Sequence, residues 1–458
     1  MSSDQSRRAF LKRSAALGIA GSASPFVMNL AAIGEAAASV ATDYKALVCV
    51  FLEGGNDFAN TLTPYDQATY DIYQTLRPTV ALARNALTPT VLSPNTALPG
   101  AVQYALAPTL APLLPIFNAG KMAAVLNIGT LIHPTTKAQY TAQNVPVPPK
   151  LFSHNDQQSF FQSASPEGAS SGWGGRIGDL FEAGNGNATL TCINATGNAV
   201  FLSGKKVAQY CVSRNGPVAL YSNTPTLFGS ATANMALRSM ISAPRTHLLE
   251  NEHTRVTKRS LDVFPDVSRA IGGAPTFSTY FDLHNALAVQ LNVVARLIAA
   301  SEQLGAKRQV FFVAQTGYDL HSKLAETQPL LLDTLAKALK SFYDTTVELG
   351  ISDKVTIFTG SDFGRSIVNN DNGSDHGWGG TQFVLGGAVK GKEFYGKSPV
   401  FANNGPDDVG QGRLLPTTSV EQYAATLATW FGVSASDMPS VLPSINNFST
   451  RNLGFMQI

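Results

Sequence analysis

The sequence predicts one large α/β domain whose central sheet is mostly parallel and buried on both faces. Five continuous apolar runs, rich in β-branched or aromatic residues, predict its strands: residues 46–57, 122–130, 309–319, 354–362 and 381–389. Because these runs are continuous rather than alternating, both faces of each strand are expected to be covered. Helical patterns separate the runs, and strands that alternate with helices are typical of parallel sheets.

Three stretches predict helices. Apolar residues recur at intervals of three and four in residues 285–305 and 329–350, and each stretch stops at a glycine. Thr418 and Glu421 have the spacing of a capping box, which predicts a third helix near the C-terminus. Residues 185–245 differ, because short apolar segments alternate there with turn residues. We expect about this range to form a small β-rich insertion in the same domain.

The N-terminus predicts the compartment. Arg7 and Arg8 lie within SRRAFLK, and a weakly apolar stretch rich in alanine and glycine follows. This pattern is typical of a twin-arginine export signal, so residues 1–41 are expected to be a signal peptide. Residues 42–458 would then form the mature domain, periplasmic or secreted. Glycine and proline interrupt the leader, which argues against an integral membrane span.

The charge balance excludes some partners. The chain has 33 Lys and Arg against 31 Asp and Glu, and the leader holds four of the basic and two of the acidic residues. The mature domain is therefore near neutral, which gives no electrostatic basis for binding nucleic acid or an anionic membrane. Of the three cysteines, Cys49 lies in a predicted strand, whereas Cys192 and Cys211 could form a disulfide in an oxidising compartment.

Carboxylates and imidazoles follow the predicted strands, at the edge where open parallel sheets bind ligands. Six such residues are candidate metal ligands: Asp57, Asp319, His321, Asp362, Asp375 and His376. Gathered at one edge, the carboxylates would repel one another unless a cation or an arginine neutralised them. Oxygen and imidazole ligands without thiols suit zinc, manganese or calcium. The sequence therefore predicts a divalent metal site there.

Local backbone structure could also explain some of the polar residues in this region. Asn and Asp in residues 369–372 are expected to form a turn, because their side chains bond the nearby backbone. Asp375 and His376, which precede small residues, favour a role in the site. Asp362 could cap a helix and pair with Arg365. Arg365 could equally bind an anionic group of a substrate.

The segment SHNDQQSF supplies two further candidates for catalysis. Ser153 and His154 begin an amphipathic stretch. A serine beside a histidine in sequence is not itself a catalytic pair, because the geometry of the folded chain decides whether the imidazole reaches the hydroxyl. Ser153 is thus a candidate nucleophile, provided that the fold brings an imidazole within reach of its hydroxyl.

Several motifs in a fixed order resemble one family. FLEGGND, SHNDQQSF, GYDLH, SDFGRS, SDHGWGG and FVLGGAVKG follow one another behind the twin-arginine leader. The chain resembles the exported bacterial family called domain of unknown function 1501, within the alkaline-phosphatase-like (sulfatase-like) superfamily, over nearly all of residues 43–450. The resemblance implies a three-layer α/β/α sandwich with one or two metal ions at the strand ends. A nucleophile would attack a phosphate or sulfate ester there.

The resemblance also assigns roles to particular residues. It implies five metal ligands: Asp57, Asp319, His321, Asp362 and His376. Arg365 would face the anion, and Ser153 or His154 lies near the position of the nucleophile. Phe363 stands where the superfamily has a further histidine, and the sulfatase nucleophile motif C-x-P-S-R is absent. The metal complement could therefore be reduced to one ion or lost.

Two functions follow from these observations. The first is an exported, metal-dependent hydrolase of phosphate or sulfate esters, acting on a small molecule or a polymer. The second is a non-catalytic protein of the cell envelope that binds another protein and uses the same fold after losing its chemistry. Phe363 and the lack of a clear nucleophile favour the second function, and the density of potential ligands favours the first.

Overall fold

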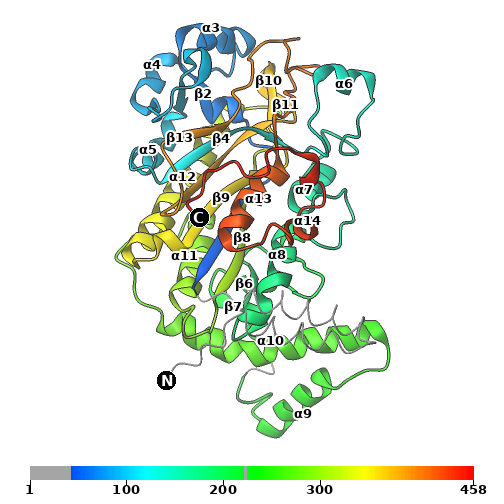
Figure 1. Cartoon of the computed structure of the whole chain (residues 1–458). Helices are drawn as coiled ribbons and strands as arrows, with labels where there is room; N and C mark the ends of the chain where they lie inside the picture. The colour runs from blue at the N-terminus through cyan, green and yellow to red at the C-terminus, as the bar shows by residue number, and fades with distance from the viewer. Residues whose placement is uncertain (1–42, 221–223) are drawn as a thin grey trace, which may run out of the picture.

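A large sheet runs through the middle of the molecule, and five of its strands coincide with the predicted apolar runs (Figure 1). These strands are β1 (Lys45–Leu52), β4 (Met122–Gly129), β8 (Arg308–Gln315), β9 (Val355–Ser361) and β12 (Gly380–Gly386). The computed structural model describes residues 43–220 and 224–458. The predicted signal peptide therefore lies outside the described residues.

Short strands complete both edges of this sheet. They are β5 (Cys192–Asn194), β6 (Tyr210–Ser213), β7 (Gly216–Pro217), β13 (Glu393–Gly396) and β14 (Thr418–Ser419). Within the described residues the sheet has ten strands in the order β13-β4-β12-β9-β1-β8-β5-β6-β7, with β14 beside β4. Two separate hairpins pair β2 (Leu62–Pro64) with β3 (Tyr104–Leu106) and β10 (Arg365–Asn370) with β11 (Gly373–His376).

The sheet is mostly parallel, as predicted, with one central exception. β1 is parallel to both of its neighbours, β8 and β9. β12 is antiparallel to β9 and to β4. The chain passes from β9 to β12 through the β10–β11 hairpin instead of a helical crossover, so β12 returns in the opposite direction.

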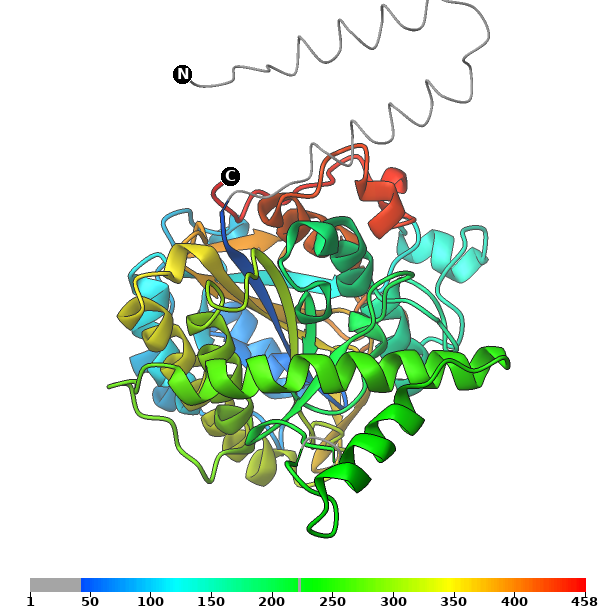
Figure 2. The ribbon, with the colours of Figure 1, turned by 90° about the horizontal axis from the view of Figure 1, so that it is seen from below.

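Helices cover both faces of the sheet and confirm the three-layer α/β/α architecture (Figure 2). On one face lie α11 (Ala286–Ala299), α12 (Leu324–Glu348) and the C-terminal half of α10 (Leu248–Gly273). On the other face lie α8 (Trp173–Phe181), α13 (Val420–Phe431) and α14 (Met438–Val441). The remaining α-helices of the described residues are α3 (Gln67–Leu76), α4 (Arg84–Leu87), α5 (Leu114–Asn118), α6 (Lys137–Ala142), α7 (His154–Ser163) and α9 (Ala231–Ser242).

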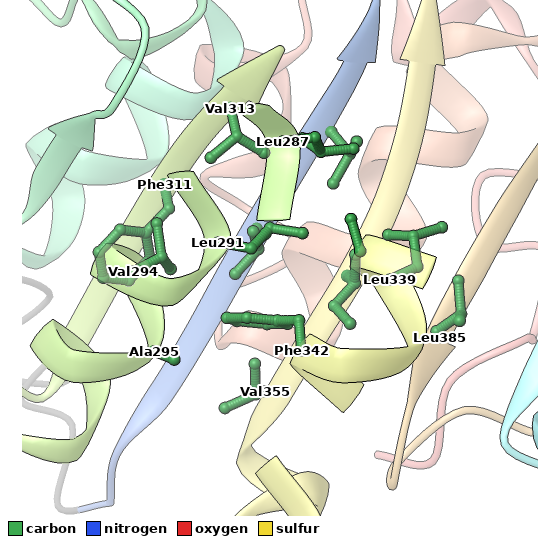
Figure 3. Close-up of a cluster of buried hydrophobic side chains, with 14 of the residues drawn as sticks. Leu287, Leu291, Val294, Ala295, Phe311, Val313, Leu339, Phe342, Val355 and Leu385 are labelled. Carbon is green, nitrogen blue, oxygen red and sulfur yellow. The ribbon is translucent and has the colours of Figure 1, made fainter. Parts of the chain in front are cut away.

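Alternate side chains of each central strand enter opposite cores. In β1, Val48 and Val50 pack with the α11–α12 layer, whereas Cys49 and Phe51 pack with the opposite layer. Figure 3 shows Leu291 of α11 and Phe342 of α12 meeting over the strands. Complete burial of a leucine or phenylalanine side chain stabilises the fold by about 1.5–3 kcal/mol. The continuous apolar runs are thus explained by two buried faces.

One local prediction differs from the structure, and a second region combines strands with a helix. The capping box of α13 uses Ser419 and Gln422 rather than Thr418 and Glu421, because Thr418 pairs with Ile128 as part of β14. The range expected to form a β-rich insertion contributes β5 and β6 to the central sheet and also contains the helix α9. Ser230 caps that helix by accepting a hydrogen bond from the Ala233 backbone.

The three cysteines all lie within the described ranges and are free thiols. Cys192 is buried in the core, whereas Cys211 is exposed on the neighbouring strand, where it pairs with Asn194. The possible disulfide between them is therefore absent. Among the described helices, none combines the length and the hydropathy that crossing a bilayer requires.

Candidate metal centre

Imidazoles and a carboxylate meet where the central strands end. Asp319 and His321 follow β8, His376 ends β11, and His154 is the first residue of α7. The β10–β11 hairpin brings His376 back over the sheet, because Arg365 at its start pairs with His376 at its end. Segments far apart in the chain thus supply one cluster at the edge that the sequence predicted.

The ring nitrogens of this cluster surround one carboxylate oxygen. Oδ1 of Asp319 lies 3.4 Å from Nε2 of His154, 3.4 Å from Nε2 of His376 and 3.1 Å from Nε2 of His321. The ligand atoms of His154, Asp319 and His376 all lie within 4.8 Å of one another. Two ligands about 2.0–2.1 Å from a tetrahedral zinc ion are about 3.3–3.4 Å apart, which matches the distances from Asp319 to His154 and to His376.

The other nitrogen of two of these rings faces a carboxylate. Nδ1 of His154 lies 2.8 Å from Oδ2 of Asp362, and Nδ1 of His321 lies 3.1 Å from Oδ1 of Asp375. An ionised carboxylate only accepts hydrogen bonds, so each Nδ1 carries the proton. In the neutral ring Nε2 then has a free lone pair that faces Asp319. A carboxylate behind a histidine is the usual partner of a metal-binding imidazole.

His376 is fixed in the same tautomer by the backbone. Its Nδ1 donates to the carbonyl oxygen of Phe152 at 2.7 Å. Its Nε2 lies 2.8 Å from Nε2 of His321. Two lone pairs at this distance require a proton or a metal ion near them, because both nitrogens are acceptors. Nε2 of His154 is buried and, although near Asp319, has no hydrogen bond with any described residue. The donor set therefore fits a divalent cation.

His154 and His376 differ in how readily they take up a proton. The hydrogen bond to Asp362 raises the pKa of His154 and outweighs the opposing effect of burial. Burial lowers the pKa of His376, and the nearby His154, Arg365 and His321 lower it further. His376 is thus kept in the neutral form that binds metals.

Arg365 contacts the carboxylate of the cluster, Asp319. Its side chain is fully buried, and its Nη1 donates to Oδ1 of Asp319 and to the carbonyl of Gly54, both at 2.9 Å. Burial opposes the ionisation of Asp319, but the hydrogen bond and charge of Arg365 outweigh it and lower the pKa of Asp319. Arg365 therefore holds Asp319. It neither pairs with Asp362 nor presents a free guanidinium to an anion.

Asp57 lies outside the cluster, in contrast to the expectation from the sequence. Arg77 Nη2 and Ser374 Oγ each donate to Oδ2 of Asp57 at 2.6 Å, and the Asn60 backbone donates to Oδ1 at 3.0 Å. The Arg77 and Asp57 side chains are 0% and 1% exposed. Donors from within the chain occupy both oxygens, so Asp57 is a buried structural carboxylate.

Asp362 and Asp375 lie behind the histidines and not among the ligand atoms. Oδ1 of Asp362 accepts the backbone N–H of Gly54 at 3.3 Å, while Oδ2 meets His154. Oδ1 of Asp375 accepts from Asn370 and from His321. Both aspartates therefore orient imidazoles.

Ser153 is the N-cap residue of α7 and is paired with a carboxylate rather than with an imidazole. Its hydroxyl donates to Oδ2 of Asp156 at 3.1 Å. Within the described ranges, it has no hydrogen bond to an imidazole. His154, which the sequence suggested as its neighbour in catalysis, belongs to the cluster instead. No pattern in the sequence signals this, because the start of α7 reaches Asp319 only through the fold.

Phe363 packs against two imidazoles of the cluster. Its ring centroid lies 5.0 Å from that of His154 and 4.8 Å from that of His376. Gly55 lies close beneath it, since a Cβ at this glycine would fall 2.3 Å from the phenyl ring. Phe363 thus forms an apolar wall that holds two imidazoles and excludes water from one side.

The fold and the cluster define an α/β protein with three histidines and one aspartate at the carboxyl edge of its sheet. The chain belongs to the family described as protein of unknown function (DUF1501), whose model matches residues 44–438. No curated protein matches it.

Solved structures that resemble the chain come from several bacteria. A protein in the alkaline phosphatase superfamily from Vibrio parahaemolyticus has a TM-score of 0.36 and 10% identity, covering 87% of this chain and 68% of that one. The lipoteichoic acid synthase LtaP from Listeria monocytogenes has a TM-score of 0.34 and 11% identity, with 87% and 75% covered. The PsFucS1 sulfatase from Pseudoalteromonas sp. has a TM-score of 0.34 and 10% identity, with 92% and 76% covered. These values are too low to transfer an activity.

Proposed function

We propose that this protein is a metal-dependent hydrolase of phosphate or sulfate esters, exported by the twin-arginine pathway to the periplasm or beyond. The observation that carries the proposal is the convergence of three Nε2 atoms on Oδ1 of Asp319. Each ring has its Nδ1 bonded to an oxygen, so the Nε2 atoms are left as acceptors, and among the described residues Arg365 is the arginine that contacts Asp319.

One divalent ion would be held by His154, Asp319 and His376, with His321 as a fourth ligand. Imidazoles in the majority favour a transition metal such as zinc or manganese over calcium. When bound, the ion supplies Lewis acidity to the oxygens of the ester. The residues of the chain position it: Asp362 and Asp375 orient two rings, and Arg365 keeps Asp319 ionised at neutral pH.

The attacking group is water in this proposal, and not Ser153. The Ser153 hydroxyl is bonded to Asp156 and has no imidazole to accept its proton. A water molecule that attacks phosphorus or sulfur displaces the alcohol oxygen of the ester, and the proton lost by water ends on that alcohol. Phe363 shields one side of the two imidazoles, which favours charge stabilisation because water is excluded there.

Hydrolysis of 4-nitrophenyl phosphate and 4-nitrophenyl sulfate tests the proposal. We expect the zinc- or manganese-loaded mature protein to hydrolyse at least one of them. Asp319→Ala and His376→Ala should reduce the rate to background and lose the ion, while Ser153→Ala should retain both rate and ion. A folded, metal-loaded protein without activity on either ester, or activity that survives in His376→Ala, would contradict the proposal.

A protruding arm favours a second function, the binding of an envelope protein. Helices α9 and α10 project beyond the body of the molecule (Figure 2), and apolar side chains on this arm are exposed. Phe228 is 98% exposed, Leu248 80% and Leu249 72%. Leu248 and Leu249 are adjacent in the chain, and contiguous exposed apolar patches mark interaction sites. This function predicts a stoichiometric partner that is lost in Leu248→Asp/Leu249→Asp but kept in His376→Ala.

A further inference from the structure

A polar groove is lined in part by residues that adjoin, in sequence, residues of the histidine–aspartate cluster or residues that contact it. A cavity of about 280 Å³ is lined by Glu53 and by Asn155, Gln158 and Ser159 of α7. Asn155 directly follows His154 in the helix. Glu53 directly precedes Gly54, which bonds Asp362 through its N–H and Arg365 through its carbonyl. The near end of the groove therefore includes the sequence neighbour of one cluster residue, His154, and the sequence neighbour of Gly54, which bonds residues that support the cluster.

A second cavity extends the groove along the carboxyl edge of the sheet. It has a volume of about 490 Å³ and is lined by Thr196, Arg214, His284 and Thr316, among others. Glu53 and Asn198 line both cavities, so the two meet at these side chains. Together they are large enough for more than one monomer of a sugar or a similar small group.

The near cavity carries negative charge and many uncharged hydrogen-bonding groups. Glu53 and Glu167 line it, and no lysine, arginine or histidine is found among the described residues that do so. A ligand portion with its own carboxylate, sulfate or phosphate would be repelled there. Amide and hydroxyl side chains on α7 both donate and accept hydrogen bonds, as the hydroxyls of an alcohol do.

Glu53 is the central group of the groove and lacks a partner. Its side chain is half-buried and has neither a hydrogen bond nor an ion pair with any described residue. Its backbone N–H donates to the carbonyl oxygen of Gln315, and its backbone carbonyl accepts a hydrogen bond from the N–H of Tyr318. A half-buried carboxylate without donors from the protein remains open to hydrogen bonds from a ligand. Burial and the nearby charge of Asp362 raise the pKa of Glu53, which reflects the same lack of donors.

We propose that this groove binds the alcohol portion of the substrate, and that this portion is an uncharged, hydroxyl-rich group such as a neutral sugar or oligosaccharide. The proposal rests on the proposed function for the position of the ester, which would lie at the cluster. The groove itself is defined by Glu53, Gln158 and Asn198, none of which belongs to the cluster. Hydroxyls of the ligand donate to Glu53, and the amides bridge neighbouring hydroxyls.

Binding of defined oligosaccharides to the full mature protein tests the groove without any need for turnover. The probes are three neutral hexasaccharides (cellohexaose, maltohexaose and mannohexaose), a carboxylated one (hexagalacturonate) and a cationic one (chitosan hexamer), each titrated by calorimetry. We expect at least one neutral hexasaccharide to bind at least about tenfold more tightly than hexagalacturonate. Glu53→Gln should weaken binding of the best neutral hexasaccharide about three- to tenfold, as expected for one hydrogen bond. The difference in affinity between this ligand and hexagalacturonate should become smaller, because the variant lacks the negative charge.

Two further variants keep the test decisive. Gln158→Leu removes an amide from the wall of the groove and should weaken the same ligand even if Glu53→Gln folds poorly. Glu250→Gln, in the exposed first turn of α10, is the matched control and should change nothing. The groove proposal is overturned if no neutral hexasaccharide binds, if hexagalacturonate or the chitosan hexamer binds most tightly, or if both groove variants bind like the wild type.

The outcome separates this inference from the proposed function. Asp319→Asn, which should lose the metal ion, should still bind the neutral hexasaccharide. Sugar binding without ester hydrolysis would leave the groove intact and contradict the hydrolase. Hydrolysis of 4-nitrophenyl esters without sugar binding would support the hydrolase and contradict the groove proposal.

Discussion

Asp362 and His154 lie 2.8 Å apart, from Oδ2 to Nδ1, although they are 208 positions apart in the chain. The opposite nitrogen of His154 faces Asp319. One carboxylate thus sets the tautomer and orientation of the ring, while a second lies where a cation would be shared. This pairing distinguishes orienting residues from ligands, and the first prediction follows from it.

Asp362→Asn should weaken zinc binding about 10- to 100-fold without abolishing it, because the ligands stay but the ring of His154 is held less firmly. His154→Ala removes a ligand and should have the larger effect. Competition with a chromophoric chelator measures both constants. Ser153→Ala is the control and should bind like the wild type. Equal losses in Asp362→Asn and His154→Ala would show that Asp362 is itself a ligand.

Removal of Arg77 tests whether Asp57 is structural. Arg77→Met leaves the Asp57 carboxylate buried without its charged partner, and such changes destabilise a protein by about 3–5 kcal/mol. Urea unfolding of the metal-loaded protein measures the change. Zinc affinity under native conditions should stay near that of the wild type. A large loss of affinity in a folded Arg77→Met protein would place Asp57 in the metal site after all.

Proton competition should make zinc affinity depend on pH. The hydrogen bond to Asp362 raises the pKa of His154 above its ordinary value of 6.5. In the metal-free protein, the stabilisation from this pair is fully present below the unfolded pKa and is lost as pH rises through the folded pKa. Zinc can bind His154 only after the protonated ring has lost the proton on Nε2. The zinc affinity should therefore rise with pH, through a midpoint above 6.5, the ordinary pKa of histidine. Asp362→Asn should move the midpoint down, and a midpoint that does not move would contradict this explanation.

Gly54 tests the close packing beneath Asp319. Its φ is +114°, and a Cβ there would fall 2.4 Å from the backbone nitrogen of Asp319. Gly54→Ala should therefore displace Asp319, destabilise the fold and weaken zinc binding at least about tenfold. Gly120 also has a positive φ, +72°, but nothing lies within 4 Å of the point where its Cβ would stand. Gly120→Ala should cost only about 1–2 kcal/mol, from backbone strain, and leave zinc affinity unchanged. Chelator competition and thermal melting of both variants decide this point.

The sequence predicts the sheet well because its strands are buried on both faces and therefore read as continuous apolar runs. It does not predict that β12 is antiparallel, since this depends on the 362–379 connection forming a hairpin rather than a helix. Nor does it place the capping box of α13, because Thr418 is taken by a strand pairing with residues almost 300 positions earlier. In both cases tertiary pairing overrides a local pattern.

The candidate site is accessible from the sequence only in part. Asp319, His321 and His376 follow or flank strands and meet at one edge, which position along the chain could suggest. The pairing of Asp57 with Arg77 could not be predicted, because Arg77 lies at the C-terminal end of α3 and nothing in the sequence links the two residues. Arg365 and Asp319 are likewise 46 residues apart, and their contact depends on the hairpin. Side-chain geometry alone decides which aspartate can bind the metal ion and which aspartate orients a histidine.

Anomalous diffraction at the zinc edge, on crystals of the metal-loaded mature protein, tests the central claim most directly. We predict one strong peak about 2.0–2.2 Å from Nε2 of His154, Nε2 of His376 and a carboxylate oxygen of Asp319, and no such peak in His376→Ala. The absence of a peak at this position in the wild type, or a peak bound instead by Asp57, would contradict the account.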